Sequence, residues 1–228
     1  MKLWHALTEK SWLEESVPAN APFDSPQREF QSRRIALTLF LAIATVLFSL
    51  FAVTFLTHSQ YPGFEALAGD AWRPLSNTTR LWVNTGLLVF SSVLMQVSLN
   101  AARASQPGLS LAALLGAGFL ALQFLIAQVW LWQILSDMGY GVRSNPASSY
   151  FFLFTGVHGI HLLIGLGVLY RPLRHMWRAE AARTIIDSLR LCALYWHYLL
   201  AVWVLLFWLL TRSVDTYRAL AILCGLEA

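Results

Sequence analysis

Five apolar segments without a charged residue constrain this chain more than any other feature. They cover residues 35–57, 81–102, 109–135, 147–170 and 191–211, and none contains Asp, Glu, Lys or Arg. A helix needs roughly 20 residues to cross a hydrocarbon layer, and each segment reaches that length. With 57% hydrophobic and only 12% charged residues, the chain lacks the charge with which a soluble protein would cover them. We expect an all-α integral membrane bundle of five transmembrane helices.

The basic residues predict how this bundle is oriented. If the five segments alternate in direction, eleven of the 16 Lys and Arg residues lie on the N-terminal side of the membrane. Because loops rich in Lys and Arg stay in the cytoplasm, the N-terminal arm (residues 1–34) should be cytoplasmic and the tail (residues 213–228) should lie on the outer side. The five-helix domain between them covers residues 35–212. The arm has no apolar core, so we expect no signal peptide.

The fourth segment carries two histidines three residues apart. On a helix, Thr155, His158, His161 and Gly165 fall within an arc of about 120°, and the opposite faces are Phe, Leu, Ile and Val. Hydrocarbon offers no hydrogen-bond partner to an imidazole, so this face should point towards protein. We therefore expect the helix to lie inside the bundle.

The second segment contains a stripe of small polar residues. Asn84, Ser91 and Ser98 recur every seven residues, with Thr85 and Ser92 beside them. Side chains of this kind let helices approach closely and hydrogen-bond across the contact. The spacing predicts a helix-packing face.

The distribution of ionisable groups excludes several functions. A pump, transporter or channel normally needs a charged group part-way through the bilayer, and the five segments have none. A net charge of +4 and an isoelectric point near 9.3 are compatible with nucleic-acid binding, but the basic residues flank the apolar segments and no nucleic-acid module is visible. We expect no nucleic-acid partner.

His158, His161 and His197 have a second interpretation as metal or haem ligands. Two histidines can share a helix face, and a third from another helix could complete a site. No carboxylate accompanies them to orient the imidazoles, and haem sites of the usual four-helix kind pair their histidines between helices at matched depth. Hydrogen bonds between helices, or contacts with lipid headgroups, are the favoured interpretation.

Two further groups of residues suggest surfaces. Arg171 and Arg174 begin a basic cluster after the fourth segment, which fits membrane topology and contact with anionic lipid. Trp203 and Trp208 lie deep in the last segment. Side chains of this size predict either ordinary packing or a broad apolar surface against a partner or acyl chains.

Four motifs resemble those of haem-copper oxidase subunit III, the cytochrome c oxidase subunit III family. The sequence TGVHGIHLLIG at residues 155–165 resembles the family signature TGxHGxHxxxG. The other resemblances are LWVNT at 81–85 with Ser91-Ser92, Gln128 with Trp132-Gln133, and YWHY at 195–198 with Val202-Trp203. The resemblance covers residues 35–211 and is to the bacterial five-helix form.

The resemblance implies a non-catalytic subunit of a bacterial terminal oxidase, which reduces oxygen to water while pumping protons. Such a subunit docks on subunit I, which holds haem and copper; it also meets subunit II and other oxidase subunits, binds phospholipid, and can belong to a respiratory supercomplex. It implies the bacterial inner membrane, a periplasmic C-terminal tail, and neither haem, copper nor an active site in this chain. The structural or lipid-contacting residues carried over are His158, His161, His197, Trp196, Asn84, Arg171 and Arg174.

Two positions depart from the family pattern. Many members carry Glu and Asp where this chain has Leu131 and Leu200, so the chain lacks the acids that a direct protonic role would use. The donor to the oxidase, cytochrome c or quinol, stays open. Two alternatives also remain: a related membrane partner of nitric oxide reductase, and a stand-alone bis-histidine haem protein for electron transfer.

Overall fold

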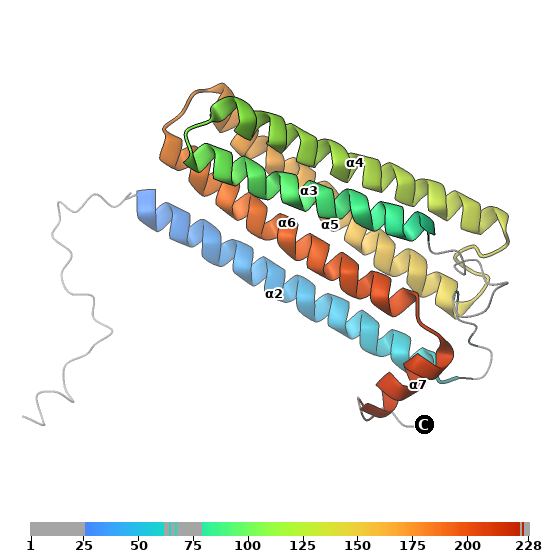
Figure 1. Cartoon of the computed structure of the whole chain (residues 1–228). Coiled ribbons are helices and arrows are strands. Elements are labelled where there is room, and N and C mark those ends of the chain that lie inside the picture. The colour runs from blue at the N-terminus through green and yellow to red at the C-terminus, as the bar shows by residue number, and fades with distance from the viewer. Residues whose placement is uncertain (1–25, 62–63, 65–66, 68–78, 224, 226–228) are drawn as a thin grey trace, which may run out of the picture. The chain divides into compact units, whose positions relative to one another are not determined.

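The computed structural model describes residues 26–61, 64, 67, 79–223 and 225. Within these residues every regular element is a helix (Figure 1). The helices are α2 (Pro26–His58), α3 (Thr79–Arg103), α4 (Pro107–Asp137), α5 (Pro146–Trp177), α6 (Ala182–Leu210) and α7 (Val214–Leu223). Residues 1–25 of the expected arm lie outside the described residues, and residues 26–34 belong to α2.

Helices α2 to α6 are long and apolar enough to cross a membrane. This confirms the prediction of an all-α bundle and of a multi-pass membrane protein. The helices run beyond the uncharged segments: α5 continues through Pro172 to Trp177, and α6 begins at Ala182. Arg171 and Arg174 therefore lie on a helix and not in a loop, because charge marks where the hydrocarbon ends but does not stop backbone hydrogen bonding.

Backbone contacts divide the chain into residues 1–36 and residues 37–228. In the first unit the structure describes the start of α2, where Arg33 and Glu29 form an ion pair of 2.5 Å one turn apart. The second unit holds the remainder of α2 and all the other helices. The closest backbone approaches in this unit join α3 with α4, α3 with α6, α4 with α5, and α5 with α6.

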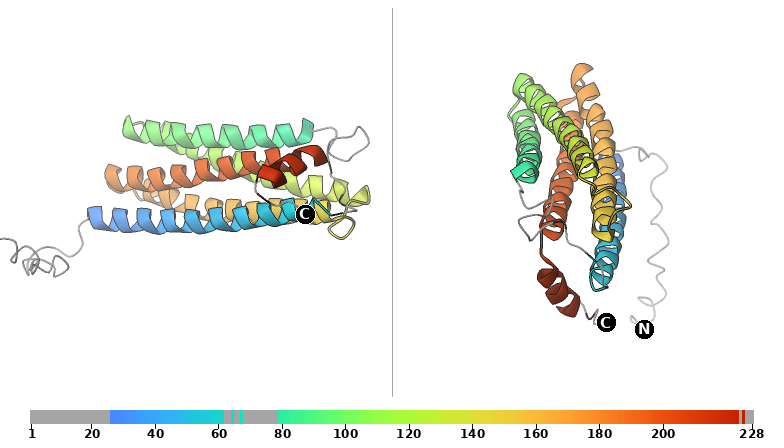
Figure 2. Two further views of the ribbon diagram at one scale, coloured as in Figure 1. Left: turned by 90° about the horizontal axis from the view of Figure 1, so that it is seen from below. Right: turned by 90° about the vertical axis from the view of Figure 1, so that its right-hand side faces the viewer.

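Helices α3 and α4 form an antiparallel hairpin, closed by a short turn at residues 104–106 (Figures 1 and 2). Pro107 starts α4, where its missing N–H costs no helical hydrogen bond. Ser98 and Ser110 exchange bonds across the hairpin: each hydroxyl donates to the other residue's carbonyl, at 2.8 and 2.9 Å. The small polar residues thus pin the two helices at close range, which confirms the packing face predicted for the second segment.

Helices α5 and α6 meet at a glycine. A Cβ atom on Gly165 would lie 2.9 Å from the ring of Tyr195, closer than real contacts allow. The Tyr195 hydroxyl donates a hydrogen bond of 2.7 Å to the carbonyl of His161, so the ring is held over the α5 backbone at this point. Gly165 therefore sets the distance between the two helices.

Helix α2, from Leu37 onwards, contacts its neighbours through long side chains. Phe48 and Phe40 pack on the ring of His161, with centroids 5.6 and 5.9 Å away. Further along, Phe55 meets Tyr150 of α5 edge-on, at 5.4 Å. Aromatic rings fill the space between α2 and α5, whereas serines lie between α3 and α4.

The short helix α7 is fixed by Tyr217. This side chain is 2% exposed, its hydroxyl donates to the carbonyl of Leu209 at 3.0 Å, and its ring meets Phe55 edge-on at 5.1 Å. Burial raises the pKa of Tyr217 above the ordinary tyrosine value of about 10 and outweighs the opposing effect of Arg212.

We expect alkaline pH to release α7. An acid whose pKa is raised by folding stabilises the folded state fully below its unfolded pKa, and this contribution falls as pH rises above about 10. The difference in tyrosinate absorbance between the wild type and Tyr217→Phe should show one hydroxyl that titrates above the ordinary value. Titration of that difference signal at the ordinary value would contradict the buried position.

Candidate functional site

His158 lies at the centre of the bundle and is fully buried. Its ring packs 5.3 Å from Trp203 of α6 and meets Phe124 of α4 edge-on at 6.0 Å. Among the described residues neither ring nitrogen has a hydrogen-bond partner. The side chain therefore fills space between three helices, and its nitrogens add no hydrogen bond to any of them.

His161 has a different environment, one turn further along α5. Its Nδ1 lies 2.8 Å from the carbonyl of Val157 and must carry the proton, because a carbonyl oxygen only accepts. The ring faces Phe40 and Phe48 of α2, as described above. The two histidines share a buried face of α5 with Thr155 and Gly165, as predicted, but contact different neighbouring helices.

Trp196 ties three helices together through one serine. Its indole Nε1–H donates to Ser91 Oγ at 2.7 Å, and that hydroxyl donates to the carbonyl of Ala117 at 2.7 Å. Ser91 is fully buried and Trp196 is 2% exposed. The bonds run from α6 through α3 to α4, so Trp196 has a structural position.

His197 lies beside Trp196 but on the exposed face of α6. Its Nδ1 is 2.6 Å from Ser92 Oγ, and its Nε2 is 3.1 Å from Gln96 Oε1. An amide oxygen only accepts, so Nε2 carries the proton and Nδ1 accepts from the serine. One neutral tautomer satisfies both bonds and joins α6 to α3.

Asn84 joins α3 to the middle of α4. Its Nδ2 donates to Gln128 Oε1 at 3.3 Å, while Gln128 Nε2 is buried without a partner among the described residues. A small pocket of about 160 Å³ reaches Asn84 and Leu131. Leu131, at a position where the family resemblance leads one to expect an acid, is 6% exposed and packs in an apolar cluster.

Arg171 and Arg174 are exposed on the last turns of α5. Nearby, His175 Nδ1 lies 2.7 Å from a carboxylate oxygen of Glu180. Cations near a helix C-terminus are favoured by the helix dipole. The two arginines present guanidinium groups outwards and belong to no interior site.

The three histidines do not converge on one point. His158 faces rings of α4 and α6, His161 faces α2, and His197 bonds to α3. A bis-histidine haem needs two imidazoles that face each other across a common space, so these residues do not fit that group. Within the described part of the chain, no three His, Cys, Asp or Glu residues cluster as metal ligands would.

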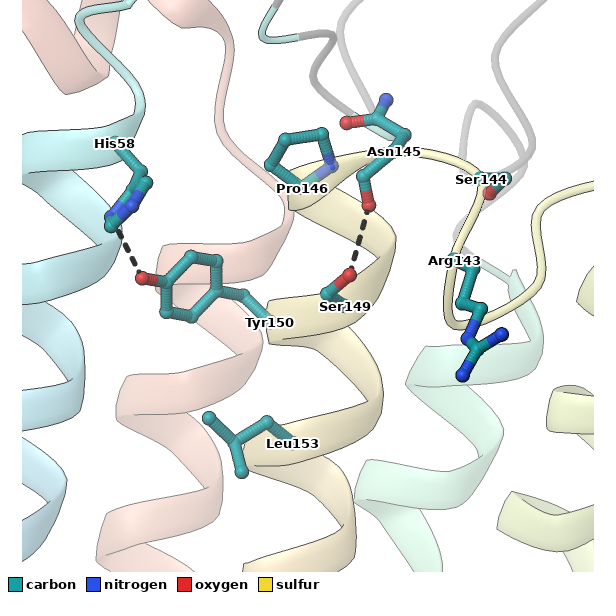
Figure 3. Close-up of a pocket in the computed structure, with 8 residues that line it drawn as sticks. All are labelled: His58, Arg143, Ser144, Asn145, Pro146, Ser149, Tyr150 and Leu153. Carbon is teal, nitrogen blue, oxygen red and sulfur yellow. Dashed lines mark hydrogen bonds between the residues drawn. The ribbon is translucent and has the colours of Figure 1, made fainter.

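One polar pocket lies where the end of α2 meets the start of α5 (Figure 3). Its volume is about 540 Å³, and the Tyr150 hydroxyl approaches His58 Nδ1 at 2.9 Å across it. Arg143 lies on the loop before α5. At the start of α5, the N–H of Ala147 already donates a hydrogen bond to the side-chain oxygen of Asn145. No periodic pattern in the sequence predicts this pocket, because its lining comes from a loop and two helix ends.

The comparison with known protein families decides what this bundle is. A family model described as "Cytochrome c oxidase subunit III" matches residues 24–212, which include all five spans. The chain belongs to the cytochrome c oxidase subunit III family. The resemblance that its motifs suggested is thereby confirmed, and the chain is a subunit III of a haem-copper oxidase.

Relatives of this subunit III agree with that assignment. Cytochrome c oxidase subunit 3 of Thermostichus vulcanus is 28% identical over 191 residues, covering 78% of this chain and 86% of the relative. A probable quinol oxidase subunit 3 of Staphylococcus haemolyticus is 25% identical over 184 residues, covering 81% and 90%. A haem-copper oxidase subunit I+III of Aeropyrum pernix is 27% identical over 154 residues, covering 67% and 18%.

The structure decides between the two interpretations of Trp203 and Trp208. Trp203 is 1% exposed and donates a hydrogen bond of 3.0 Å to Thr85, so it faces the interior and not a partner or acyl chains. Trp208 is 41% exposed, as a surface position requires. Sequence reasoning also missed Gln96 and Tyr195 as partners of the histidine helices. Gly165 indicated a close approach on this face, but not which residue makes it.

Proposed function

We propose that this subunit III is a non-catalytic, accessory component of the oxidase, which docks on subunit I and stabilises it. The supporting observation is how the spans use their polar groups. The hydroxyls of Ser91, Ser92 and Ser98 each bond to a residue of another helix. Polar groups that bond between helices hold a scaffold in shape.

Docking on subunit I is supported by one relative. The Aeropyrum pernix protein is named as subunit I and subunit III together, so that protein joins the two parts in one polypeptide. We propose the same association here between separate chains, with haem and copper held by the partner. Subunit II, other oxidase subunits and a respiratory supercomplex are proposed as further neighbours. The relatives named above are oxidase subunits, which favours an oxidase over a nitric oxide reductase.

Phospholipid is proposed as a bound component. An apolar groove of about 670 Å³ runs between α4 and α5, with Gly156 and Gly159 in its wall and Trp130 beside them. Its shape and apolar lining suit an acyl chain. At the end of α5, exposed Arg171 and Arg174 suit a phosphate headgroup. His158 and Trp196 are buried, so their proposed role is structural, as is that of Asn84.

The proposed location is the bacterial inner membrane. The excess of Lys and Arg on the N-terminal side supports a cytoplasmic N-terminus and a periplasmic C-terminus. We therefore expect a reporter that works only in the periplasm to be active when it is fused after α7, and a reporter that works only in the cytoplasm to be inactive there.

The chain expressed alone should be colourless. Because the histidines do not converge, we expect no Soret band from the single polypeptide, and haem absorption from the complex that it pulls down in mild detergent. Mass spectrometry of the co-migrating subunits identifies the catalytic partner, and an oxidase subunit I is expected. A red single chain with a bis-histidine spectrum would overturn the proposal, and a nitric oxide reductase subunit in its place would redirect it.

A further inference from the structure

The polar pocket between the end of α2 and the start of α5 carries positive charge. We call it the α2–α5 pocket; its volume is about 540 Å³. In Figure 3, His58 and Tyr150 lie on one side of Ser149, and Arg143 lies on the other. Among the described residues that line the pocket, none is an aspartate or a glutamate. The lining therefore offers a cation and no acid that would neutralise it.

The backbone that carries Arg143 is held in a fixed turn. The N–H and the hydroxyl of Ser144 both donate to the carbonyl of Gly141, at 3.1 and 2.8 Å. The hydroxyl of Ser149, on α5, donates to the carbonyl of Val142. The residues on both sides of Arg143 are thus tied down, while its guanidinium has no ion pair or hydrogen bond within the described part of the chain. A cation on a fixed turn can bind an anion at a small cost in ordering.

Tyr150 gives the pocket a second donor. His58 Nδ1 lies 2.9 Å from the carbonyl of Thr54, which can only accept, so Nδ1 carries the proton. The Tyr150 oxygen, also 2.9 Å from Nδ1, therefore accepts from the imidazole. The O–H of Tyr150 then has no acceptor among the described residues. Phe55 meets the tyrosine ring edge-on at 5.4 Å, so packing holds this donor in place.

These two donors suit an anionic group that only accepts hydrogen bonds. The planar fork of an arginine matches two oxygens of a phosphate, and a hydroxyl can reach a third. The pocket also lies at the level of lipid headgroups, because Arg143 comes four residues before the uncharged segment that starts at residue 147. The anion most abundant at that level is the phosphate of a phospholipid.

The α2–α5 pocket continues towards the apolar groove between α4 and α5. Leu153 lines the pocket, and Gly156, about one turn further along α5, lines the groove. Ile160, which also lines the groove, lies two turns below Leu153 on the same side of the helix. Both side chains are exposed. An acyl chain that starts beside the pocket can therefore follow this apolar strip into the groove.

We propose that the α2–α5 pocket binds the phosphate of a phospholipid through Arg143 and the hydroxyl of Tyr150, and that an acyl chain of this lipid lies in the α4–α5 groove. The inference rests on the proposed role of phospholipid as a bound component, and it assigns a headgroup site to the groove. This site lies at the opposite end of α5 from Arg171 and Arg174. Free phosphate has the same oxygen chemistry, but it would fill the pocket alone.

Photolabelling of the full-length chain in nanodiscs tests the need for a phosphate. The probe is phosphatidylglycerol with a diazirine in one acyl chain, and the matched probe is a diacylglycerol with the same chains and no phosphate. We expect the phospholipid to label residues 156–163 of α5, and the diacylglycerol to label them about tenfold less. Equal labelling by the two probes, or labelling spread evenly over the outer faces of the helices, would overturn the proposal.

Variants in the pocket test the two donors. Arg143→Gln should lower the labelling of residues 156–163 by the phospholipid about tenfold, and Tyr150→Phe, which keeps the packed ring, about threefold. The matched control is Arg212→Gln, because Arg212 is an exposed arginine that follows α6 and does not line the pocket. Its labelling should equal that of the wild type. Equal losses in the Arg143 and Arg212 variants would show a general effect of charge and no specific site.

Inorganic phosphate distinguishes the two sources of the anion. Millimolar inorganic phosphate should leave the labelling of the wild type unchanged, because the acyl chain adds to the affinity of the lipid. Displacement of the lipid by inorganic phosphate, together with saturable phosphate binding that requires Arg143, would assign the pocket to a free anion and refute the lipid. Labelling of the groove that does not depend on Arg143 removes this headgroup site and leaves the proposed phospholipid in place. If no phospholipid labels α4 or α5, both proposals fail.

Discussion

Replacing Gly165 by leucine is expected to separate α5 from α6 and to remove most of this subunit from the mature oxidase. The new Cβ would lie 2.9 Å from Tyr195 Cε1 and 3.4 Å from Leu199 Cδ1. Tyr195 cannot retreat without breaking its 2.7 Å bond to the His161 carbonyl. Overpacking of this kind, with one lost interhelical hydrogen bond, costs about 3 kcal/mol.

Cysteine labelling in the complex measures this effect. Cys192 is fully buried and lies three residues before Tyr195 on the buried face of α6. In a Cys224→Ser background, the rate at which a maleimide labels this subunit reports opening of the α5–α6 contact. The matched control is Gly167→Leu, because a Cβ at Gly167 meets nothing within 4 Å. Equal labelling of the two leucine variants would show that Gly165 does not set the spacing.

The helices and their buried faces were predictable because two signals sit in the local sequence. A long apolar stretch without charged residues marks each span. The recurrence of Asn84, Ser91 and Ser98 every seven residues marks the buried side of α3. Both patterns depend on a periodicity that any helix imposes. Polar residues on one face of a membrane helix need partners, so their burial follows without knowledge of the neighbours.

The partners of those polar residues were not predictable, because they depend on how the helices are arranged. His158 and His161 lie on one face, which the sequence shows, yet one faces α4 and α6 while the other faces α2. The sequence is compatible with either an inward-facing or an outward-facing Trp203, and the structure shows that its indole N–H donates to Thr85 inside the bundle. The end of helix α5 was not predictable either. The charge of Arg171 marks where the membrane span ends, but the helix continues to Trp177.

The arrangement around His158 explains how a polar residue inside the bundle can act through packing alone. Its imidazole spans the space between Trp203 and Phe124, and the described residues give its two nitrogens no hydrogen bond. A buried nitrogen without a hydrogen bond lowers the stability of the fold, so the packing of the imidazole against its neighbours must offset that loss. An apolar side chain of similar volume at this position should therefore be tolerated.

We expect His158→Ala to shorten the working lifetime of the oxidase while its initial rate of oxygen consumption stays close to wild type. Alanine leaves a cavity between α4, α5 and α6, which costs about 2 kcal/mol of stability, and no reacting group is touched. His158→Leu fills most of that space and loses no hydrogen bond, so its lifetime should match that of the wild type. Oxygen-electrode traces, followed until activity decays, give both quantities from one experiment.

The leucine variant separates packing from ligation, because a haem, metal or headgroup contact would need an imidazole nitrogen. If His158 acted through such a contact, leucine would be as damaging as alanine, and both would lose initial rate or subunit content together. A packing role predicts the opposite order, with alanine short-lived and leucine durable. That order follows from a fully buried imidazole that packs against the rings of Phe124 and Trp203.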